Sequence, residues 1–434
     1  MWPLLLTLLS FSVYAQDTDK DLSLYVEMFK LKALKAPSAK NEALRKLGLR
    51  LFYDVQLSGK GNISCHFCHQ QGNGMGDALP LGLGEGAKGL GLKREQLSGV
   101  LLGRHSPSVF NMGLEGVNNL FWDGRVSKNA KGWITPEPGL NGENPIYADI
   151  AKTLDSPLAV QALFPIANPA EMLGQESKLS NIEAWRAAEE RVFNGRFKAT
   201  YAQMFKEAYP QETKFNIGHI ANAIGEYQRH TFLAVNTPWD LYLRGEKNIL
   251  PLEAKKGAVI FYSKGMCVNC HQGDHLTVFG FQNIGTPQIG PGTKDGDDLG
   301  RFDVTGNPAD KYKFRVSPLR NIALTAPYMH DGVYKDLWEV IEHYNHPMHQ
   351  LMHFQFDYSG NSYREKLTKD ERRETQIARA QNMANNLPRM LSLTEEEKAS
   401  LWCFMVVGLT DVKSQQNLKG VLDENPRCHP VLTR

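Results

Sequence analysis

Two short segments combine residues that can attach a metal-containing cofactor. Residues 65–69 read Cys-His-Phe-Cys-His, and residues 267–271 read Cys-Val-Asn-Cys-His. In such a C-x-x-C-H pattern, two thiols one helical turn apart can bond to the vinyl groups of a haem, and the histidine can bind its iron. A zinc site would need a further ligand, and a thioredoxin-like pair would explain neither the histidine nor the second copy. The pattern predicts two covalently bound c-type haems. Their expected attachment residues are Cys65, Cys68 and His69 for the first haem and Cys267, Cys270 and His271 for the second.

Each motif follows a similar stretch of sequence. Gly48–Tyr53 precedes the first motif and Gly257–Tyr262 precedes the second, and both begin with glycine and end with Phe-Tyr. This indicates two copies of one module, each a helix that carries an aromatic side chain toward the haem, followed by the attachment turn. Ile217–Tyr227 has helical periodicity, whereas Gly285–Asp303 is a loop rich in glycine and proline. We predict a mainly α fold of two c-type cytochrome domains, each with one covalently bound haem and with long loops.

The length of the chain also favours two domains. It has 434 residues, and a single hydrophobic core stops growing at about 250–300 residues. The repeat places the boundary near residues 240–250, which gives an N-terminal domain over residues 16–245 and a C-terminal domain over residues 246–434. The formal net charge of +2 is close to zero, and nothing in the composition suggests binding to nucleic acid.

Residues 1–15 are predicted to be a signal peptide. Trp2–Val13 is almost wholly apolar, and the segment ends with the small residue Ala15. Because no Lys or Arg precedes the apolar run, a retained anchor is the alternative, although the run is short for a membrane span. No later apolar run reaches the length of about 18 residues that a span requires. The mature protein is therefore expected not to span a membrane and to be periplasmic.

Cys403 and Cys428 lie outside the two motifs. In an oxidising compartment they could form a disulfide that ties the C-terminal tail to the helix around Trp402. Two buried free thiols are the alternative, and the sequence leaves both open.

Beyond the motifs, ordered segments resemble the bacterial di-haem cytochrome c peroxidase family, including its MauG-like branch. The resemblance extends from about Leu47 to Tyr344 and resumes near Leu391. Its landmarks are residues 51–54 (LFYD), 57–59 (LSG), 106–111 (SPSVFN), 121–125 (FWDGR), 165–172 (PIANPAEM) and 318–332 (PLRNIALTAPYMHDG). The resemblance implies that the N-terminal haem is the peroxide site and that the C-terminal haem passes or stores electrons.

The resemblance also suggests roles for individual side chains. Glu171 matches the distal glutamate of the family, Gln161 its distal glutamine and Trp122 the tryptophan between the haems. A carboxylate suits cleavage of the O–O bond, because a base must take a proton from one peroxide oxygen and return it to the other. Trp122 is expected to relay electrons, although its local sequence alone would favour a core tryptophan. Arg125 and Arg320 are candidate partners of haem propionates, and each could equally pair with a surface carboxylate.

The sixth ligand of the C-terminal haem separates the branches of the family. Tyr344 stands where classical members have methionine, as in the MauG-like branch. Methionine raises the potential of a haem, whereas a phenolate donates charge and stabilises ferric and higher iron. The alternative ligands nearby are Met329, His343, His346 and Met348.

Two positions depart from the classical pattern. Gly82–Gly91 contains no histidine that could cap the N-terminal haem, so its iron is expected to be open to peroxide without prior reduction. His105 is the one nearby residue that could still cap it. His105 also replaces an asparagine that helps to bind calcium in the family, while the matching Thr325 and Pro327 are present. Calcium prefers oxygen ligands, so it is retained only as an open alternative.

Further differences concern partners. Gly265 occupies the place of the surface tryptophan through which the MauG-like branch oxidises its protein substrate, which argues against the same partner and route. Two insertions set the chain apart, at residues 126–158 and 347–388. The second begins with a His/Met cluster at residues 346–353, which is either a copper-binding segment or ordinary loop packing.

These features give a first hypothesis: an exported peroxidase that reduces hydrogen peroxide to water with electrons from a small cytochrome c or cupredoxin. The alternative is a MauG-like, peroxide-dependent oxidase that modifies Tyr or Trp of a partner protein through a bis-high-valent haem state. A simple electron carrier is the third hypothesis. Glu171 and Gln161 argue against the carrier, and Tyr344 favours the oxidase over the classical peroxidase.

Overall fold

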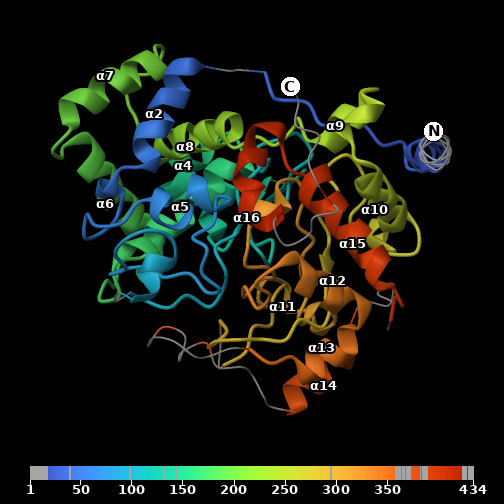
Figure 1. The fold of residues 1–434 in the computed structure, drawn as a ribbon. Coiled ribbons are helices and arrows are strands. Elements are labelled where there is room, and N and C mark those ends of the chain that lie inside the picture. The colour runs from blue at the N-terminus through green and yellow to red at the C-terminus, as the bar shows by residue number, and fades with distance from the viewer. Residues whose placement is uncertain are drawn as a thin grey trace, which may run out of the picture.

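The structure is a computed structural model, and it is mainly helical, with two groups of helices that lie side by side (Figure 1). It describes residues 18–38, 41–96, 99–130, 132–142, 144–293, 296–356, 363, 367, 373–381, 383, 390–422 and 428. The predicted signal peptide lies outside the described residues. None of the helices in the described part of the chain is long and apolar enough to cross a membrane.

The first group packs around one apolar core, whose buried residues run from Leu34 to Val235. It contains α2 (Glu42–Phe52), α4 (Ala148–Thr153), α5 (Pro157–Ala167), α6 (Asn181–Phe193), α7 (Lys198–Ala208) and α8 (Ile217–Thr231). The prediction of a helix over residues 217–227 is confirmed by α8, which is buried along most of its length. Asn41 starts α2, because its side-chain oxygen accepts a hydrogen bond from the main-chain N–H of Ala43 at 2.9 Å.

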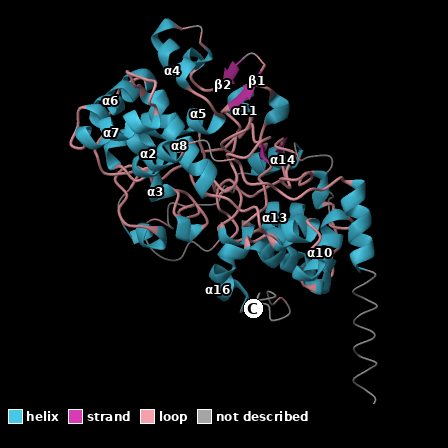
Figure 2. Cartoon of the chain, turned by 90° about the horizontal axis from the view of Figure 1, so that it is seen from above, coloured by secondary structure: helices cyan, strands magenta, loops and turns pink. Residues whose placement is uncertain are grey.

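The second group has its own core, which includes Leu22 and Leu31 and continues from Trp239 to Cys428. It contains α9 (Pro238–Leu243), α10 (Leu252–Tyr262), α12 (Leu337–Asn345), α13 (Pro347–His353), α14 (Arg373–Gln381), α15 (Glu395–Cys403) and α16 (Lys419–Leu422). Residues 18–28 are also helical. Most long loops run between the two groups, where Figure 2 shows them in pink, together with the short helix α11 (Phe302–Thr305).

The internal repeat is visible in the structure. The stretches before the two motifs are the ends of α2 and α10, as predicted, and both bury a phenylalanine, Phe52 and Phe261. The repeat also includes a second helix in each group. A Cβ atom on Gly48 would overlap the carbonyl oxygen of Ala223 in α8, and one on Gly257 would overlap that of Ser400 in α15. Both glycines therefore allow two helix backbones to approach closely.

The sheets are small. In the first insertion, β1 (Ser127–Asn129) and β2 (Gly132–Ile134) form an antiparallel pair with Ser127 opposite Ile134. Between the helix groups, β3 (Phe281–Gln282) pairs with β4 (Phe314–Arg315), also antiparallel. The second insertion forms α13 and α14, so the expectation of loop packing at residues 346–353 is wrong: this segment is helical from Pro347.

A third, small core joins the second insertion to the loop after the first motif. Its buried members are Leu79, Leu81, Leu83, Ala87, Tyr363 and Leu367. The hydroxyl of Tyr363 donates a hydrogen bond to the carbonyl oxygen of Leu81 at 2.6 Å and accepts one from its N–H at 3.0 Å. The insertion thereby fixes a loop that lies almost 300 residues earlier in the sequence.

Cys403 and Cys428 form a disulfide, with an S–S distance of 2.02 Å and a Cα–Cα distance of 5.6 Å. The structure thereby settles the alternative that the sequence left open. The bond joins residue 428 to the end of α15, beside Trp402 in the second core.

Candidate functional site

The first motif begins with one helical turn, α3 (Cys65–Cys68), and ends at His69. The Nδ1 atom of the His69 ring lies 3.0 Å from the carbonyl oxygen of Met75. This contact uses Nδ1 and leaves Nε2 as the nitrogen that can bind a metal, an arrangement typical of haem and zinc histidines. Burial lowers the pKa of His69, which favours the neutral, ligating form.

The second motif repeats this geometry. Its cysteines lie at a short turn over Cys267–Asn269, and Nδ1 of His271 lies 3.0 Å from the carbonyl oxygen of Leu276. Burial lowers the pKa of His271 to about 4. The two predicted attachment sites therefore hold their histidines alike, each through a contact of Nδ1 with a main-chain carbonyl oxygen.

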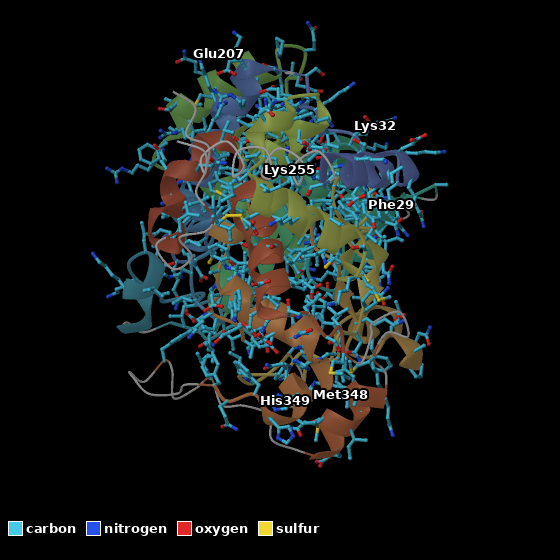
Figure 3. The ribbon with its side chains drawn as sticks, turned by 45° about the vertical axis from the view of Figure 1, so that its right-hand side comes forward. Phe29, Lys32, Glu207, Lys255, Met348 and His349 are labelled. Carbon is cyan, nitrogen blue, oxygen red and sulfur yellow. A yellow bond between two sulfur atoms is a disulfide. The ribbon has the colours of Figure 1, made fainter. Side chains whose placement is uncertain are left out.

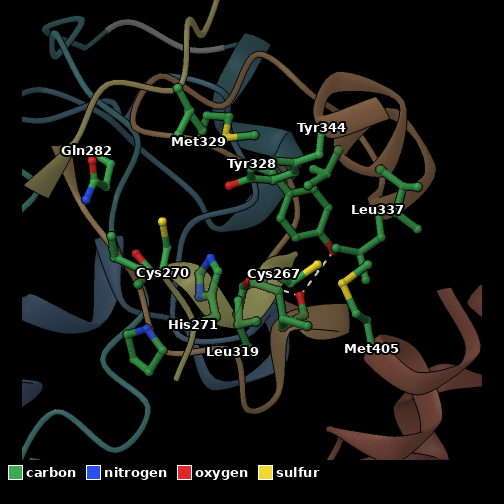
Figure 4. Close-up of a pocket in the computed structure, with 18 of the residues that line it drawn as sticks. Cys267, Cys270, His271, Gln282, Leu319, Tyr328, Met329, Leu337, Tyr344 and Met405 are labelled. Atoms are coloured by element: carbon green, nitrogen blue, oxygen red, sulfur yellow. Dashed lines mark hydrogen bonds between the residues drawn. The ribbon is translucent and has the colours of Figure 1, made fainter. Parts of the chain in front are cut away.

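A deep, mostly apolar cavity adjoins the second motif (Figure 4). Cys267, Cys270 and His271 form part of its wall, and Leu319, Leu337 and Leu401 are among the apolar residues that line the rest. Such a lining, with few polar groups, suits a large planar cofactor such as haem. The residues present therefore fit the cofactor that the motif predicts.

Of the residues considered as sixth ligand, Tyr344 and Met329 line this cavity. Both ring nitrogens of His343 already have partners, because Nδ1 lies 2.8 Å from the Tyr334 hydroxyl and Nε2 lies 2.9 Å from the Ile284 carbonyl oxygen. His343 therefore has no nitrogen left for a metal.

His346 and Met348 are not among the residues that line the cavity. Instead, Nε2 of His346 contacts the side chain of Asn345 at 3.1 Å, and Met348 is 37% exposed on α13. Met405, which the sequence did not suggest, lies in the cavity wall on a π-helical turn over Phe404–Gly408. Burial raises the pKa of Tyr344, so its hydroxyl keeps its proton unless a metal cation replaces that proton.

Arg315 was also not predicted. It lines the cavity and is buried, and its Nε donates a hydrogen bond to the carbonyl oxygen of Phe121 at 3.0 Å. Its Nη1 has no hydrogen-bond partner within the described part of the chain, and burial lowers its pKa to about 10. A buried guanidinium without a counter-ion is costly. A haem propionate would supply the missing negative charge, which supports the fit of the cavity to haem.

Arg320, in contrast, already has a partner. Its Nε and Nη2 donate to the two carboxylate oxygens of Asp240 at 2.9 and 2.8 Å, and both side chains are buried. Arg125 pairs with Asp123 at 2.9 Å and lies over the ring of Phe121 at 3.8 Å. The carboxylate partner of each arginine, Asp240 or Asp123, is buried, so neither arginine pairs with a surface carboxylate as the second alternative had it.

Trp122 lies in the wall of the cavity beside the second motif, next to His105. It lines the cavity, and its indole Nε1 donates a hydrogen bond to the carbonyl oxygen of His105 at 2.8 Å. The His105 ring also lines the cavity, and it is close enough to His69 to lower the pKa of that residue. Nδ1 of His105 lies 2.8 Å from the carbonyl oxygen of Leu79. Trp122 and His105 therefore connect the surroundings of the two motifs.

Glu171 lies on a π-helical turn, Pro169–Leu173, that follows α5. The Leu173 N–H donates to the carbonyl oxygen of Asn168 at 2.9 Å, five residues back, as in a π-helix, a geometry frequent at functional sites. The side chain of Asn168 donates to Oε1 of Glu171 at 2.7 Å. Burial raises the pKa of Glu171, while the charge of Arg125 opposes this shift.

The Glu171 turn is close to the first motif. The charge of Glu171 contributes to raising the pKa of the Cys68 thiol. The N–H of Glu85 donates to the carbonyl oxygen of Ala170 at 2.9 Å, and a Cβ atom on Gly84 would overlap that same oxygen. The glycine-rich loop over residues 82–91 is thus held directly against the turn that carries Glu171.

The remaining predicted residues also fall near these sites. Gln161 is half-buried on α5, which leads directly into the Glu171 turn. Thr325 and Pro327 line the cavity beside the second motif, and the hydroxyl of Thr325 donates a hydrogen bond to the carbonyl oxygen of Ile322 at 3.0 Å. Within the described residues, no three His, Cys, Asp or Glu side chains gather as a metal site would require.

Comparisons of the sequence with a family model and with known proteins point to the same family. The sequence model of the di-haem cytochrome c peroxidases matches residues 42–248. The chain is 31% identical over 309 residues to cytochrome c551 peroxidase of Pseudomonas aeruginosa, covering 69% of this chain and 70% of that protein. It is 29% identical over 302 residues to methylamine utilization protein MauG of Methylorubrum extorquens, covering 69% and 67%.

Solved structures agree with this match. A MauG-like protein associated with microbial copper homeostasis aligns with a TM-score of 0.60 at 26% identity, covering 93% of this chain and 98% of that one. The di-haem peroxidase BthA from Burkholderia thailandensis aligns with a TM-score of 0.59 at 18% identity, which supports the fold. Family members are oxidoreductases that contain haem and use hydrogen peroxide. With a half-buried carboxyl group beside one C-x-x-C-H motif and a mostly apolar cavity beside the other, the chain belongs to the di-haem cytochrome c peroxidase family.

Proposed function

We propose that this protein reduces hydrogen peroxide to water, with two protons and two electrons consumed for each peroxide. Two c-type haems would be attached covalently, one to Cys65 and Cys68 and the other to Cys267 and Cys270. His69 and His271 would bind the irons through Nε2. When bound, the haems supply irons that react with peroxide and hold electrons. The observation that carries the proposal is Glu171, a half-buried carboxyl group with a raised pKa that Asn168 fixes beside the first motif.

Glu171 is the proposed general acid and base. In its charged form it accepts a proton from one peroxide oxygen, and it then returns this proton to the oxygen that leaves as water. The bond from Asn168 to Oε1 orients the group and leaves Oε2 available for the transferred proton. Gln161 on the preceding helix is proposed to help orient peroxide. Trp122 is proposed to relay electrons, since it lines the cavity beside the second motif and bonds to His105, which lies near His69.

The peroxide position is proposed to be accessible without prior reduction of the other haem. Residues 82–91 contain no histidine. The remaining candidate cap, His105, lines the second cavity and already contacts the carbonyl oxygen of Leu79. The loop itself is fixed by Tyr363 and by the contact of Gly84 with the Glu171 turn. These contacts favour a loop that stays in one arrangement.

Tyr344 is the proposed sixth ligand of the C-terminal haem, and it supports a second candidate function. It lines the cavity, whereas His343 has no free nitrogen and Met348 is outside the cavity wall. A tyrosine ligand makes a haem a poor electron acceptor but stabilises oxidised iron. The alternative function is therefore a MauG-like, peroxide-dependent oxidase that modifies Tyr or Trp of a partner protein. With Gly265 in place of the surface tryptophan, such a partner would be oxidised by another route.

The proposal includes location, domains and partners. The two separate cores support two domains, which we propose over residues 16–245 and 246–434. Leu22, Leu31 and Trp239, which precede this boundary, pack in the second core. Export through a signal peptide at residues 1–15 would place the protein in the periplasm, where the disulfide is stable. A small cytochrome c or a cupredoxin would donate the electrons. Calcium at Thr325 and Pro327 is a secondary proposal, to be tested by metal analysis of the purified protein.

The first test is an absorption and EPR titration of the purified holoprotein with peroxide, followed by turnover with a reduced small cytochrome c. Two haems per chain and rapid oxidation of the donor would support the peroxidase. Slow oxidation of the donor, with an oxidised state that persists after peroxide is consumed, would support the oxidase. Two low-spin haems that react only after partial reduction would contradict the open site, and one haem or none would contradict the attachment sites.

A further inference from the structure

Helix α13 presents two exposed histidines one helical turn apart. His349 and His353 are separated by four residues, so their side chains lie on the same face of the helix. Figure 3 shows His349 and its neighbour Met348 at the edge of the molecule. None of residues 346–353 lines the cavity beside the second motif. The pair is therefore separate from the site described above.

The two rings have the separation of a pair that shares one metal ion. Their centroids are 5.0 Å apart, and the ring planes are inclined by 42°. With metal–nitrogen bonds of about 2.0–2.1 Å and ligand angles between about 90° and 109°, two imidazoles on one ion have centroids about 4.5–5.2 Å apart. The observed separation falls within this range without any movement of the backbone. Within the described residues, neither ring takes part in a hydrogen bond or an ion pair.

The opposite face of the helix holds the pair in place. Pro347 and Leu351 are buried, and Leu351 is only 1% exposed. The main-chain N–H of Gln350 donates to the carbonyl oxygen of His346 at 3.0 Å, and that of Phe354 donates to Gln350 at 3.0 Å. Because the helix is anchored, metal binding has to order only the two exposed side chains and not the backbone that carries them.

The neighbouring side chains favour copper over other ions. Met352 is half-buried and lies three residues after His349 on the same side of the helix. Met348 is exposed and lies one helical turn before Met352. Thioethers are soft ligands that suit Cu(I), while imidazole binds copper and zinc. Among divalent first-row ions, copper binds a given nitrogen site most tightly. We propose that α13 binds one copper ion through His349 and His353, with Met352 as a further ligand for Cu(I). This proposal does not depend on the peroxidase function.

The test uses the full-length holoprotein, with both haems in place. It is titrated with copper(II) sulfate in the presence of glycine as a weak competitor, and bound copper is measured by equilibrium dialysis and EPR. We expect one tightly bound copper per chain, with nitrogen hyperfine structure from two imidazoles. Because the second imidazole binds intramolecularly, His349→Ala and His353→Ala should each weaken copper binding by about 100-fold.

Gln350→Ala, on the same helix, is the matched control and should bind copper like the wild type. An unchanged haem absorption spectrum in every variant shows that the fold is intact, which is expected because both histidines are exposed. Equal copper binding by the wild type and by the double variant His349→Ala/His353→Ala would overturn the proposal, as would the absence of copper binding by the wild type. Met352→Leu should weaken binding of Cu(I) more than of Cu(II), and equal effects would remove Met352 from the site.

Discussion

The side-chain amide of Asn168 donates a hydrogen bond to Oε1 of Glu171 at 2.7 Å within a single π-helical turn. Asn168 caps this turn, and side chains three positions apart lie on one side of a helical turn, here next to the loop over residues 82–91. The carboxyl group is thus oriented by a neighbour in its own segment.

Replacing Glu171 by Gln is expected to slow the reaction with peroxide by about 10²–10⁴, since a positioned acid or base typically contributes this much. The isosteric change should leave haem content and the absorption spectrum unaltered. Stopped-flow absorption measures the rate. Glu176→Gln serves as the control, because Glu176 is exposed and pairs only with Lys60 among the described residues. A wild-type rate in Glu171→Gln would exclude this residue from proton transfer.

The peroxide reaction should lose rate at acidic pH. Burial raises the pKa of Glu171 above its ordinary value of 4.5, and the base must be ionised, so the rate falls as the pH falls through this raised pKa. The bond from Asn168 opposes the shift. Asn168→Ala should therefore move the acidic limb of the pH–rate profile to higher pH. The same limb should vanish in Glu171→Gln, and its persistence there would assign it to another group.

Tyr344→Phe should change the EPR spectrum of one haem and leave the other unaltered, because phenylalanine has no atom that can bind iron. Met329→Leu and Met405→Leu are the matched controls, since both methionines line the same cavity. We expect both of them to keep the wild-type spectrum. If one of these changes the low-spin signal while Tyr344→Phe does not, that methionine is the ligand.

Arg315→Leu should lower the reduction potential of the C-terminal haem, since it removes a buried positive charge that stabilises the reduced form. Potentiometric titration of each haem measures the effect. Lys313→Gln removes a positive charge two residues away, where Asp310 already pairs with it at 3.2 Å, and should leave the potential nearly unchanged. An equal shift in both variants would indicate a general effect of net charge.

Tyr363→Phe should loosen the loop after the first motif. The change removes both hydrogen bonds to the main chain of Leu81, and a buried main-chain group left without a partner costs about 1–3 kcal/mol. Hydrogen–deuterium exchange of the Leu81 amide should become faster, while amides of α8 stay protected. Tyr25→Phe, which alters no hydrogen bond described in the structure, is the control. If Leu81 stays equally protected in Tyr363→Phe, the hydroxyl does not hold the loop.

The sequence was sufficient for features that depend on neighbouring residues. The two motifs, the helices that precede them and the helix over residues 217–227 follow from short patterns, and the structure has all three helices. Of the loop expected over residues 285–303, the described residues 285–293 and 296–301 lie outside helices and named strands, and α11 begins at Phe302. The resemblance located Glu171, which the structure places near Cys68.

Features that depend on distant contacts could not be predicted. Arg315 has an ordinary local sequence, and its importance appears only when the fold buries it beside a cavity, with no acidic partner among the described residues. The role of Tyr363 could not be predicted either, because the residue that it contacts, Leu81, lies 282 positions earlier in the sequence. Met405 reaches the cavity through a π-helical turn, whose extra residue shifts side chains from the positions that regular helical periodicity would give.

The bond between Cys403 and Cys428 has a consequence for biogenesis. The chain carries six cysteines, of which two are oxidised in the bond, while the proposed covalent attachment of haem would require the four of the C-x-x-C-H motifs to remain thiols until haem arrives. An oxidising compartment treats all six alike at first, and neighbouring thiols such as Cys267 and Cys270 close readily. With covalent haems and export as proposed, maturation would require a reductant that reopens the motif cysteines but spares the C-terminal bond. Cells that lack this reductant should accumulate chains in which the tail is cross-linked correctly and the haem sites are closed.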